Sequence, residues 1–475
     1  MDTHKNKLLN KNTLLFFFII FAAFFLRIYN LNFEDYWFDE QASFWVSDPT
    51  INLNDTIERS NELDRGSNIV FNLFLKNFFL SFGYDPQIGR YLPFIFGLLS
   101  IPSLCYLVFQ ISKNQSYLLV GFLSAINFYL ISYSQEVRVY SFIFLLSTLS
   151  LIFFLKLLDE ENLNNKKYLY ACSYIFFSLL GVLLHTFFFI IIISQFLFSL
   201  LNIVFNKKNF VFILFCILSI PLLFLILMYD YLLLQLGIKS FWIQQVNLDF
   251  FINYFFSRFF GSKIMGAIYL LCLIYLIYTG RKKILKLEDK NFLLILILVL
   301  SYVLPLTYGL IKQPILIDRY IIFVLVPIFA LISILIFELK NTKIKYIILF
   351  IILSSSLINN YIEIFNREKS KPEFNKILEY ISKSNNPNII TKTNDTLTEK
   401  ILINYSKNTI TSKNSNLNFY SSNNDYSKLN ALWILCYKPI NGFDCSPTTY
   451  LSSSWLKVDD VEYKLIGSTL YKNKN

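Results

Sequence analysis

The feature that most limits the fold of this chain is a series of apolar runs, each about as long as a bilayer is thick. A helix needs about 20 apolar residues to cross the hydrocarbon core, where all backbone hydrogen bonds must be satisfied internally. We expect spans at about residues 14–30, 88–110, 117–133, 141–157, 168–184, 186–204, 210–228, 264–279, 292–308, 320–337 and 346–362. The chain is therefore predicted to be an α-helical polytopic membrane protein with about eleven transmembrane helices.

Composition agrees with this fold class. The 475 residues are 55% hydrophobic and only 16% charged, which leaves too little polar surface to cover a soluble protein of this size. The net charge of +11 comes mostly from lysines in short segments between spans. That distribution indicates membrane topology and not a nucleic-acid surface, so the expected partner is the lipid bilayer.

Two apolar segments need separate treatment. Residues 168–204 are continuous, but at ~1.5 Å per residue they form a helix of about 55 Å, far longer than the hydrocarbon core. We therefore expect two spans that fold back near His185. Residues 69–82 are too short to cross, and Asn68, Asn72 and Lys76 form a polar stripe, which favours a helix lying in the membrane interface.

The lysine-rich segments fix the expected orientation. With eleven spans, the basic groups all fall on one face: Lys5, Lys7 and Lys11; Lys166 and Lys167; Lys207 and Lys208; Arg281 to Lys290; and Lys340 to Lys345. By the positive-inside rule this face is cytoplasmic, with the N-terminus inside and the C-terminus outside. The first run lacks a small-residue cleavage site, so we expect no cleavable signal peptide. The predicted location is the plasma (inner) membrane.

The chain changes character at about residue 366. We expect a transmembrane domain at 1–365, with interfacial helices in its outer loops 31–87 and 229–263. The tail, 366–475, is predicted to be a small extracytoplasmic α/β domain, with a helix after Pro372 and strands at 388–391 and 431–435. Cys436 and Cys445 lie in this tail and either form a disulfide or remain two thiols.

Polar residues gather on the outer face of this topology. Asp39 and Glu40 follow the first span, and Glu136 and Arg138 lie in the turn at 134–140. Intramembrane-edge acids are usually functional, whereas Glu34 and Asp35 are interpreted as solvated loop residues and Arg27 as a structural, snorkelling residue. A carboxylate can accept a proton from an attacking hydroxyl, and arginines can hold a phosphate leaving group. Transfer of a sugar from a polyprenyl-phosphate carrier has these requirements.

Several motifs resemble those of GT-C glycosyltransferases of the protein O-mannosyltransferase and aminoarabinose-transferase type. The first is Ala23-Phe24-Phe25-Leu26-Arg27-Ile28 with Trp37-Phe38-Asp39-Glu40-Gln41-Ala42-Ser43. The second is Phe82-Gly83 with Arg90-Tyr91-Leu92-Pro93 and 97–102. The others are Tyr133-Ser134-Gln135-Glu136-Val137-Arg138-Val139-Tyr140 and Asp318-Arg319-Tyr320. The resemblance covers about residues 14–330, with the motifs in the family's order.

The resemblance implies a role for each matching residue. Asp39 is expected to be the general base, with inversion at the anomeric carbon; Glu40 is expected to orient it or hold the acceptor, and Glu136 to be the second acid. The expected substrate-binding residues are Arg138, Tyr140, Arg319 and Tyr320, with the two arginines on the lipid phosphate. Some relatives bind a divalent metal, for which Glu136 and His185 are candidate ligands, but His185 alone is also typical of a helix cap.

Two other functions remain open at this stage. A flippase for a lipid-linked glycan would be expected to carry charges near the middle of several spans, and these spans carry few. A glycan ligase or polymerase would also act outside, without needing an acidic pair after the first span. The sugar, and whether the acceptor is a lipid, a glycan or a protein, are not predicted by the sequence.

Overall fold

The structure is a computed structural model of the chain, and it describes residues 2–64, 68–159, 163–203, 210–236, 243, 257–287, 289–393, 395–421, 426, 429–441 and 454–474. The chain forms two compact units. The helical unit comprises residues 1–29, 93–135 and 139–367. The mixed unit comprises residues 30–92, 136–138 and 368–475. The two predicted domains, 1–365 and 366–475, are drawn along the sequence and stay a prediction.

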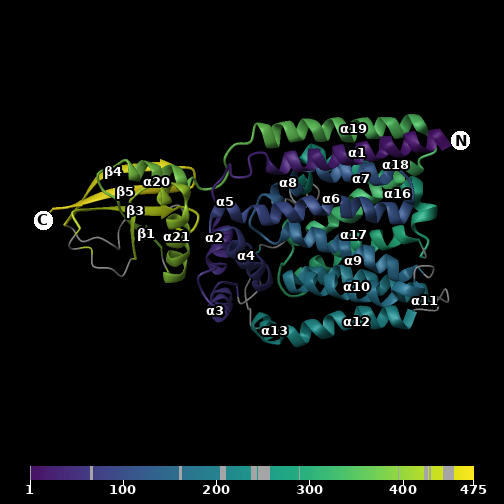
Figure 1. The fold of residues 1–475 in the computed structure, drawn as a ribbon, viewed down its shortest axis with the longest axis horizontal. Helices are drawn as coiled ribbons and strands as arrows, with labels where there is room; N and C mark the ends of the chain where they lie inside the picture. Colours follow the sequence, from purple (N-terminus) through teal and green to yellow (C-terminus); the bar gives the residue numbers. More distant parts are fainter. Residues whose placement is uncertain are drawn as a thin grey trace. The chain divides into compact units, whose positions relative to one another are not determined.

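The helical unit is a bundle of long apolar helices (Figure 1). Within the described residues, eight helices are long and apolar enough to cross a membrane, or nine if one bent pair forms a single span. Its helices are α1 (Asp2–Ile28), α6 (Tyr91–Ser112), α7 (Ser116–Ala125), α8 (Phe128–Ser134), α9 (Tyr140–Leu158), α10 (Leu163–Leu184), α11 (Phe189–Ile203), α12 (Phe210–Leu227), α13 (Tyr229–Leu236), α15 (Ser257–Phe260), α16 (Lys263–Ile284), α17 (Lys290–Ile311), α18 (Leu325–Glu338) and α19 (Thr342–Asn360).

Each predicted span coincides with a helix or a helix pair, which confirms the polytopic helical fold. The spans predicted at 186–204 and 210–228 are apolar helices of 10–17 residues. The chain does turn at His185, where the short 3-10 helix η2 (Thr186–Phe188) begins. The aromatic segment 250–256 of the predicted interfacial piece lies outside the described residues.

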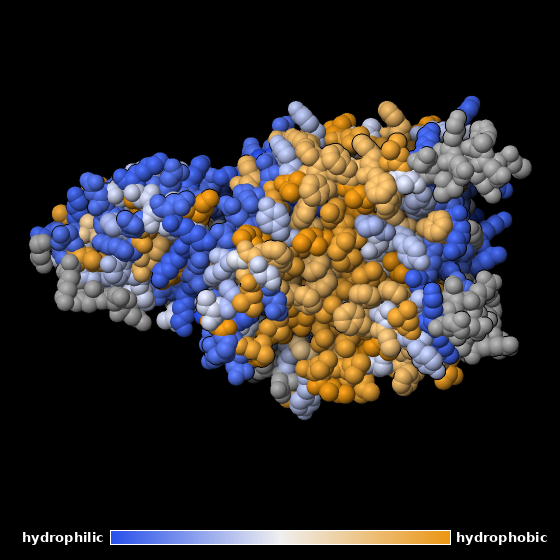
Figure 2. All heavy atoms as spheres, in the orientation of Figure 1, coloured by the Kyte–Doolittle hydropathy of each residue, from blue (hydrophilic) through white to orange (hydrophobic). Residues whose placement is uncertain are grey.

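Burial within the bundle differs strongly between helices. The span that ends with α18 is 89% buried within the protein, whereas the α1 span is 17% buried. The outer helices instead expose large apolar side chains, such as Phe17, Val211 and Phe350. Figure 2 shows the resulting apolar surface over the middle of the helical unit, with polar residues toward its ends. This pattern is the one that a hydrocarbon environment requires.

The bent pair α7–α8 shows how the bundle tolerates a broken helix. The two helices meet at 60°, because Asn127 leaves the helical path and its side chain caps α8 by accepting from the Leu130 N–H at 3.0 Å. The freed carbonyls at the end of α7 accept from the Arg27 guanidinium, at 2.9 Å for Ala125 and 3.0 Å for Ser124. Arg27 is fully buried, so its role is structural, but it caps a neighbouring helix and does not snorkel.

The mixed unit contains a five-stranded sheet in the order β2-β1-β3-β5-β4 (Figure 1). Its strands are β1 (Asn388–Lys392), β2 (Asn418–Tyr420), β3 (Ala431–Tyr437), β4 (Trp455–Tyr463) and β5 (Ile466–Asn473). β1 is parallel to β2 and β3, and β5 is antiparallel to β3 and β4. Every residue of the central strand β3 is buried. The predicted small α/β fold of the tail, with strands at 388–391 and 431–435, is confirmed.

Seven helices complete the mixed unit: α2 (Phe38–Val46), α3 (Leu53–Asp64), α4 (Ile69–Phe82), α5 (Pro86–Gly89), α20 (Phe374–Ser382), α21 (Thr396–Asn408) and α22 (Ile410–Lys413). Phe374, Ile377, Leu378 and Ile381 give α20 one fully buried apolar face. Helix α2 packs on α21 through Ala42, Trp45, Val46 and Ile401. These contacts join the first outer loop and the tail into one core.

Helix α4 has the opposite polarity to a water-facing helix. The predicted polar stripe points inward: Asn72 and Lys76 are buried, and the Lys76 ammonium donates to the Thr56 hydroxyl at 2.8 Å. Its exposed face is apolar and includes Phe74, Leu80 and Phe82. The Lys76 ammonium is therefore satisfied inside the mixed unit, and the exposed apolar face is of the kind that lies against lipid in an interfacial helix.

Candidate functional site

The adjacent acids Asp39 and Glu40 lie in the first turn of α2, where a helix favours negative charge. One oxygen of Glu40 accepts from the backbone N–H of Trp37 at 3.1 Å, which closes the start of the helix. The two side chains point into different surroundings. Glu40 is 1% exposed and the side chain of Asp39 is 47% exposed. Asp39 is therefore the acid that an incoming molecule can reach.

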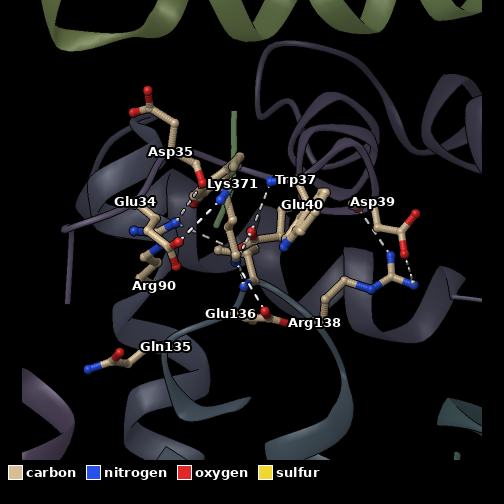
Figure 3. Close-up of polar contacts among 12 residues, drawn as sticks. Glu34, Asp35, Trp37, Asp39, Glu40, Arg90, Gln135, Glu136, Arg138 and Lys371 are labelled. Atoms are coloured by element: carbon tan, nitrogen blue, oxygen red, sulfur yellow. Dashed lines mark hydrogen bonds and ion pairs between the residues drawn. The ribbon is translucent and has the colours of Figure 1, made fainter. Parts of the chain in front are cut away.

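The buried carboxylate of Glu40 is surrounded by donors (Figure 3). It accepts from the Lys371 ammonium at 2.6 Å and from the Val137 N–H at 2.9 Å, and the Arg90 guanidinium lies 3.9 Å away. Burial raises the pKa of Glu40, but the charges of Lys371 and Arg90 and these hydrogen bonds outweigh it, so the pKa lies below its ordinary value. Glu40 is thus a buried, ionised carboxylate that binds the neighbouring cations, and Asp39 is the exposed acid.

The turn at 136–138 belongs to the same unit as α2 and contacts its first turn. Arg138 donates to the backbone carbonyl of Asp39 at 3.1 Å and to the Ser43 hydroxyl at 3.3 Å, and its guanidinium lies 3.9 Å from the Asp39 carboxylate. Glu136 lies 3.1 Å from the Lys371 ammonium. The structure therefore brings together four of the predicted residues: Asp39, Glu40, Glu136 and Arg138.

Lys371 is a site residue that the sequence analysis missed. Its side chain is 3% exposed and its ammonium contacts both Glu40 and Glu136. It comes from the segment before α20, in a tail with many lysines. No spacing or pattern in the sequence distinguishes it from those neighbours.

Glu34 and Asp35 are not solvated loop residues, contrary to the sequence interpretation. Glu34 is 5% exposed, and its carboxylate accepts from the Ser370 hydroxyl at 2.8 Å and from the backbone N–H of Lys371 at 3.2 Å. Asp35 accepts from the backbone N–H of Asn375 at 2.8 Å, and burial raises its pKa despite this contact. Both acids fasten the segment that carries Lys371.

Aromatic rings also pack against the residues just before α2. Tyr36 stacks on Tyr405 with ring centroids 5.3 Å apart, and its backbone N–H donates to the Tyr405 hydroxyl at 3.0 Å. The Arg90 guanidinium lies over the Tyr36 ring at 5.0 Å and donates to the carbonyl of Leu31 at 2.9 Å. Residues from the first loop and from α21 therefore hold the residues just before α2 in place.

The other predicted residues form a separate cluster in the helical unit. Arg319 lies 6.0 Å from the ring centroid of Tyr140 and 5.9 Å from that of Tyr320. The ring centroids of His185 and Tyr320 are 4.7 Å apart. The Nδ1 atom of His185 accepts from the Phe187 N–H at 3.2 Å and caps η2. This cluster is a cation set among aromatic rings, with His185 as a helix cap.

Metal-binding groups are not gathered in the described part of the chain. No set of three or more His, Cys, Asp or Glu side chains there has the arrangement to hold an ion. Of the two candidate ligands, Glu136 pairs with Lys371 and His185 makes the cap described above. The described cysteines at 105, 172, 216 and 272 are free. Cys436 is disulfide-bonded, whereas Cys445 lies outside the described residues.

Solved structures with the same fold are membrane glycosyltransferases. ArnT from Cupriavidus metallidurans matches in its apo state with a TM-score of 0.61 and 10% identity, covering 96% of this chain and 97% of that one. The same protein bound to undecaprenyl phosphate matches with a TM-score of 0.58, 11% identity and the same coverage. The archaeal oligosaccharyltransferase AglB from Archaeoglobus fulgidus, in complex with an inhibitory peptide and a dolichol-phosphate, matches with a TM-score of 0.54 and 12% identity, over 86% of this chain and 61% of that chain.

Sequence comparison adds nothing to this result: no family model matches the chain, and no curated protein matches it. At 10–12% identity, the structural similarities establish the fold and not the activity. The fold is of the GT-C type, as predicted. None of the three structures is an O-mannosyltransferase, so that part of the predicted resemblance stays a prediction.

Proposed function

We propose that the chain is a membrane glycosyltransferase that moves a sugar from a polyprenyl-phosphate carrier to an acceptor hydroxyl. The observation that carries the proposal is the difference between the two adjacent acids of α2. Glu40 is buried and lies beside two cations, whereas Asp39 is half-exposed, with the Arg138 guanidinium 3.9 Å from its carboxylate. An accessible carboxylate on a fixed helix end is what a general base requires.

Asp39 acts as the general base in this proposal. Its carboxylate takes the proton of the acceptor hydroxyl while that oxygen attacks the anomeric carbon of the donor. The bond from the anomeric carbon to the phosphate oxygen breaks, and the lipid phosphate leaves with the electron pair. Attack opposite to the leaving group inverts the anomeric configuration. Arg138 orients Asp39 through its contacts with the first turn of α2.

Negative charge develops on the leaving phosphate as the bond breaks, and a cation placed beside it lowers the barrier. Arg319, placed among Tyr140 and Tyr320, supplies a guanidinium for this purpose, and the tyrosine hydroxyls supply further donors. That the ArnT structure holds undecaprenyl phosphate and the AglB structure a dolichol-phosphate supports a lipid-linked donor here. We further propose an extracytoplasmic site in the plasma (inner) membrane, with the N-terminus inside.

A flippase is less well supported. The charged residue buried inside the span of α1, Arg27, donates to the backbone of α7 and is engaged in structure. It is therefore not positioned as part of a path for a charged substrate.

The test is a transfer assay in purified membranes with labelled polyprenyl-phosphate sugars. Asp39→Asn should lower the transfer rate by about 100–10,000-fold, because the amide cannot accept the proton. Asp55→Asn is the matched control, since Asp55 is an exposed acid in the first turn of α3, and this variant should transfer at the parental rate. Equal rates for Asp39→Asn and the parent would exclude Asp39 as the base. A reporter fused after residue 475 tests the orientation separately, and a cytoplasmic reporter would contradict the proposed topology.

A further inference from the structure

Two acids and one lysine form a charged cluster in the mixed unit. The Lys371 ammonium lies 2.6 Å from Glu40 and 3.1 Å from Glu136, and the Lys371 and Glu40 side chains are 3% and 1% exposed. The Glu136 side chain is 24% exposed. Placing a second carboxylate beside the buried Glu40 is unfavourable unless a cation lies between them. The ammonium is this cation (Figure 3).

Several independent contacts hold the segment that carries Lys371 in place. Glu34 accepts from the backbone N–H of Lys371 at 3.2 Å and from the Ser370 hydroxyl at 2.8 Å. A few residues later, Asn375 binds Asp35 through its backbone N–H. The segment that carries Lys371 is therefore tied to the residues before α2 on both sides of the lysine. An ammonium held this way costs little entropy when it binds the carboxylates.

A divalent cation would have to occupy the same place. Carboxylate oxygens bind Mg²⁺, Ca²⁺ or Zn²⁺ at about 2.0–2.6 Å, and such an ion would need both acids as ligands. The ammonium already contacts both acids, so a metal between Glu40 and Glu136 would require Lys371 to leave a buried position. The residues present therefore do not fit a divalent ion at this point.

We propose that Lys371 is the resident cation of the site, which holds Glu40 and Glu136 together in place of a divalent metal. Lys371 is a positioning residue: through Glu136 and Glu40 it fixes the 136–138 turn, and through Arg138 that turn fixes Asp39. This inference rests on the proposed function only in treating Asp39 as the base. The arrangement of the cation and the two acids can be tested without any transfer activity.

The first experiment measures Mn²⁺ binding to the purified protein in detergent by electron paramagnetic resonance. The Mn²⁺ binding of the parent, if there is any, should be the same in Glu136→Gln. Lys371→Ala should create a new Mn²⁺ site, because the two carboxylates then lose the ammonium that contacts both of them, although the Arg90 guanidinium stays 3.9 Å from Glu40. The Lys371→Ala/Glu136→Gln double variant should lose this site. Mn²⁺ binding by the parent that depends on Glu136, or no new site in Lys371→Ala, would overturn the proposal. The readout is independent of the donor, so it stands even if the proposed transfer reaction is wrong.

The second experiment measures transfer by the same variants. Lys371→Ala should transfer about 100-fold more slowly, because the base loses its fixed geometry, and added ethylammonium should restore part of the rate. Lys369→Ala is the matched control: Lys369 lies two residues away and pairs with Glu373 at 3.5 Å while 38% exposed, so its variant should keep the parental rate. Parental transfer should survive EDTA. Loss of parental transfer in EDTA, with recovery on adding Mn²⁺, would overturn the proposal.

Discussion

Replacing Glu40 by alanine should destabilise the mixed unit strongly. The change leaves Lys371 with Glu136 alone and removes the nearest acid from the Arg90 guanidinium, although both cations remain buried. Removing one partner of a buried ion pair costs about 3–5 kcal/mol, because the remaining charge keeps its desolvation penalty. The Val137 N–H also loses its acceptor, which places the expected loss at the upper end of this range.

The assay is denaturant unfolding of the purified protein in mild detergent, followed by tryptophan fluorescence. Four of the five tryptophans lie in the mixed unit, so the signal reports on it; these are Trp37, Trp45, Trp433 and Trp455. Glu62→Ala, which removes an exposed acid of α3, is the control and should change the free energy of unfolding by less than about 0.5 kcal/mol.

A double-mutant cycle tests the reasoning directly. Lys371→Met alone should also cost about 3–5 kcal/mol. The Glu40→Ala/Lys371→Met double variant should cost about 2–3 kcal/mol less than the sum of the two single variants, because it removes both charges of the pair. If the two effects add to within about 0.5 kcal/mol, the 2.6 Å contact between these side chains contributes nothing and the account of the site is wrong.

Four further outcomes are expected. Arg138→Ala should lower the transfer rate about 100-fold with little change in the amount of folded protein, because α2 loses two hydrogen bonds and Asp39, the proposed base, loses its neighbouring charge. Glu34→Ala should cost about 1–3 kcal/mol in the unfolding assay, because the Ser370 hydroxyl and the Lys371 N–H lose their acceptor. The pKa of Glu40 is below its ordinary value of 4.5, so its stabilisation is complete above that pH and is lost as the pH falls further; the difference in unfolding free energy between the parent and Glu40→Gln should therefore shrink under acid conditions. Gly121→Ala should destabilise the helical unit by about 1–3 kcal/mol, since the new methyl group would clash with the Cys105 sulfur, and adding Cys105→Ala should recover most of the loss in a thermal-unfolding measurement.

Much of the fold could be predicted because apolar periodicity reports directly on burial in lipid or in a core. The spans, helix α20 and the buried strands β1 and β3 all carry this signal. Strand β4 does not. It lies at the edge of the sheet, and most of its residues are partly or fully exposed, including Lys457, Asp459 and Asp460. Charges of this kind protect a sheet edge, but in the sequence they look like a loop.

The candidate site was predictable in part for a different reason. Acids and arginines in short outer loops are conspicuous in an apolar chain, so Asp39, Glu40, Glu136 and Arg138 could be grouped before their contacts were known. What the sequence did not reveal was which acid is buried and what neutralises it. Lys371 lies 331 residues from Glu40 along the chain, and only tertiary packing brings them together.

The same separation along the chain determines when the mixed unit can finish folding during synthesis. A ribosome that adds about 5–20 residues per second needs roughly 20–60 s to travel from Glu40 to Lys371. During that interval Glu40 has been synthesised but its closest counter-ion has not. The mixed unit combines residues 30–92 with residues 368–475, so it cannot complete its packing until the last part of the chain has been made. A polypeptide that stopped before residue 371 would lack the ammonium that lies 2.6 Å from Glu40 and the sheet of the mixed unit.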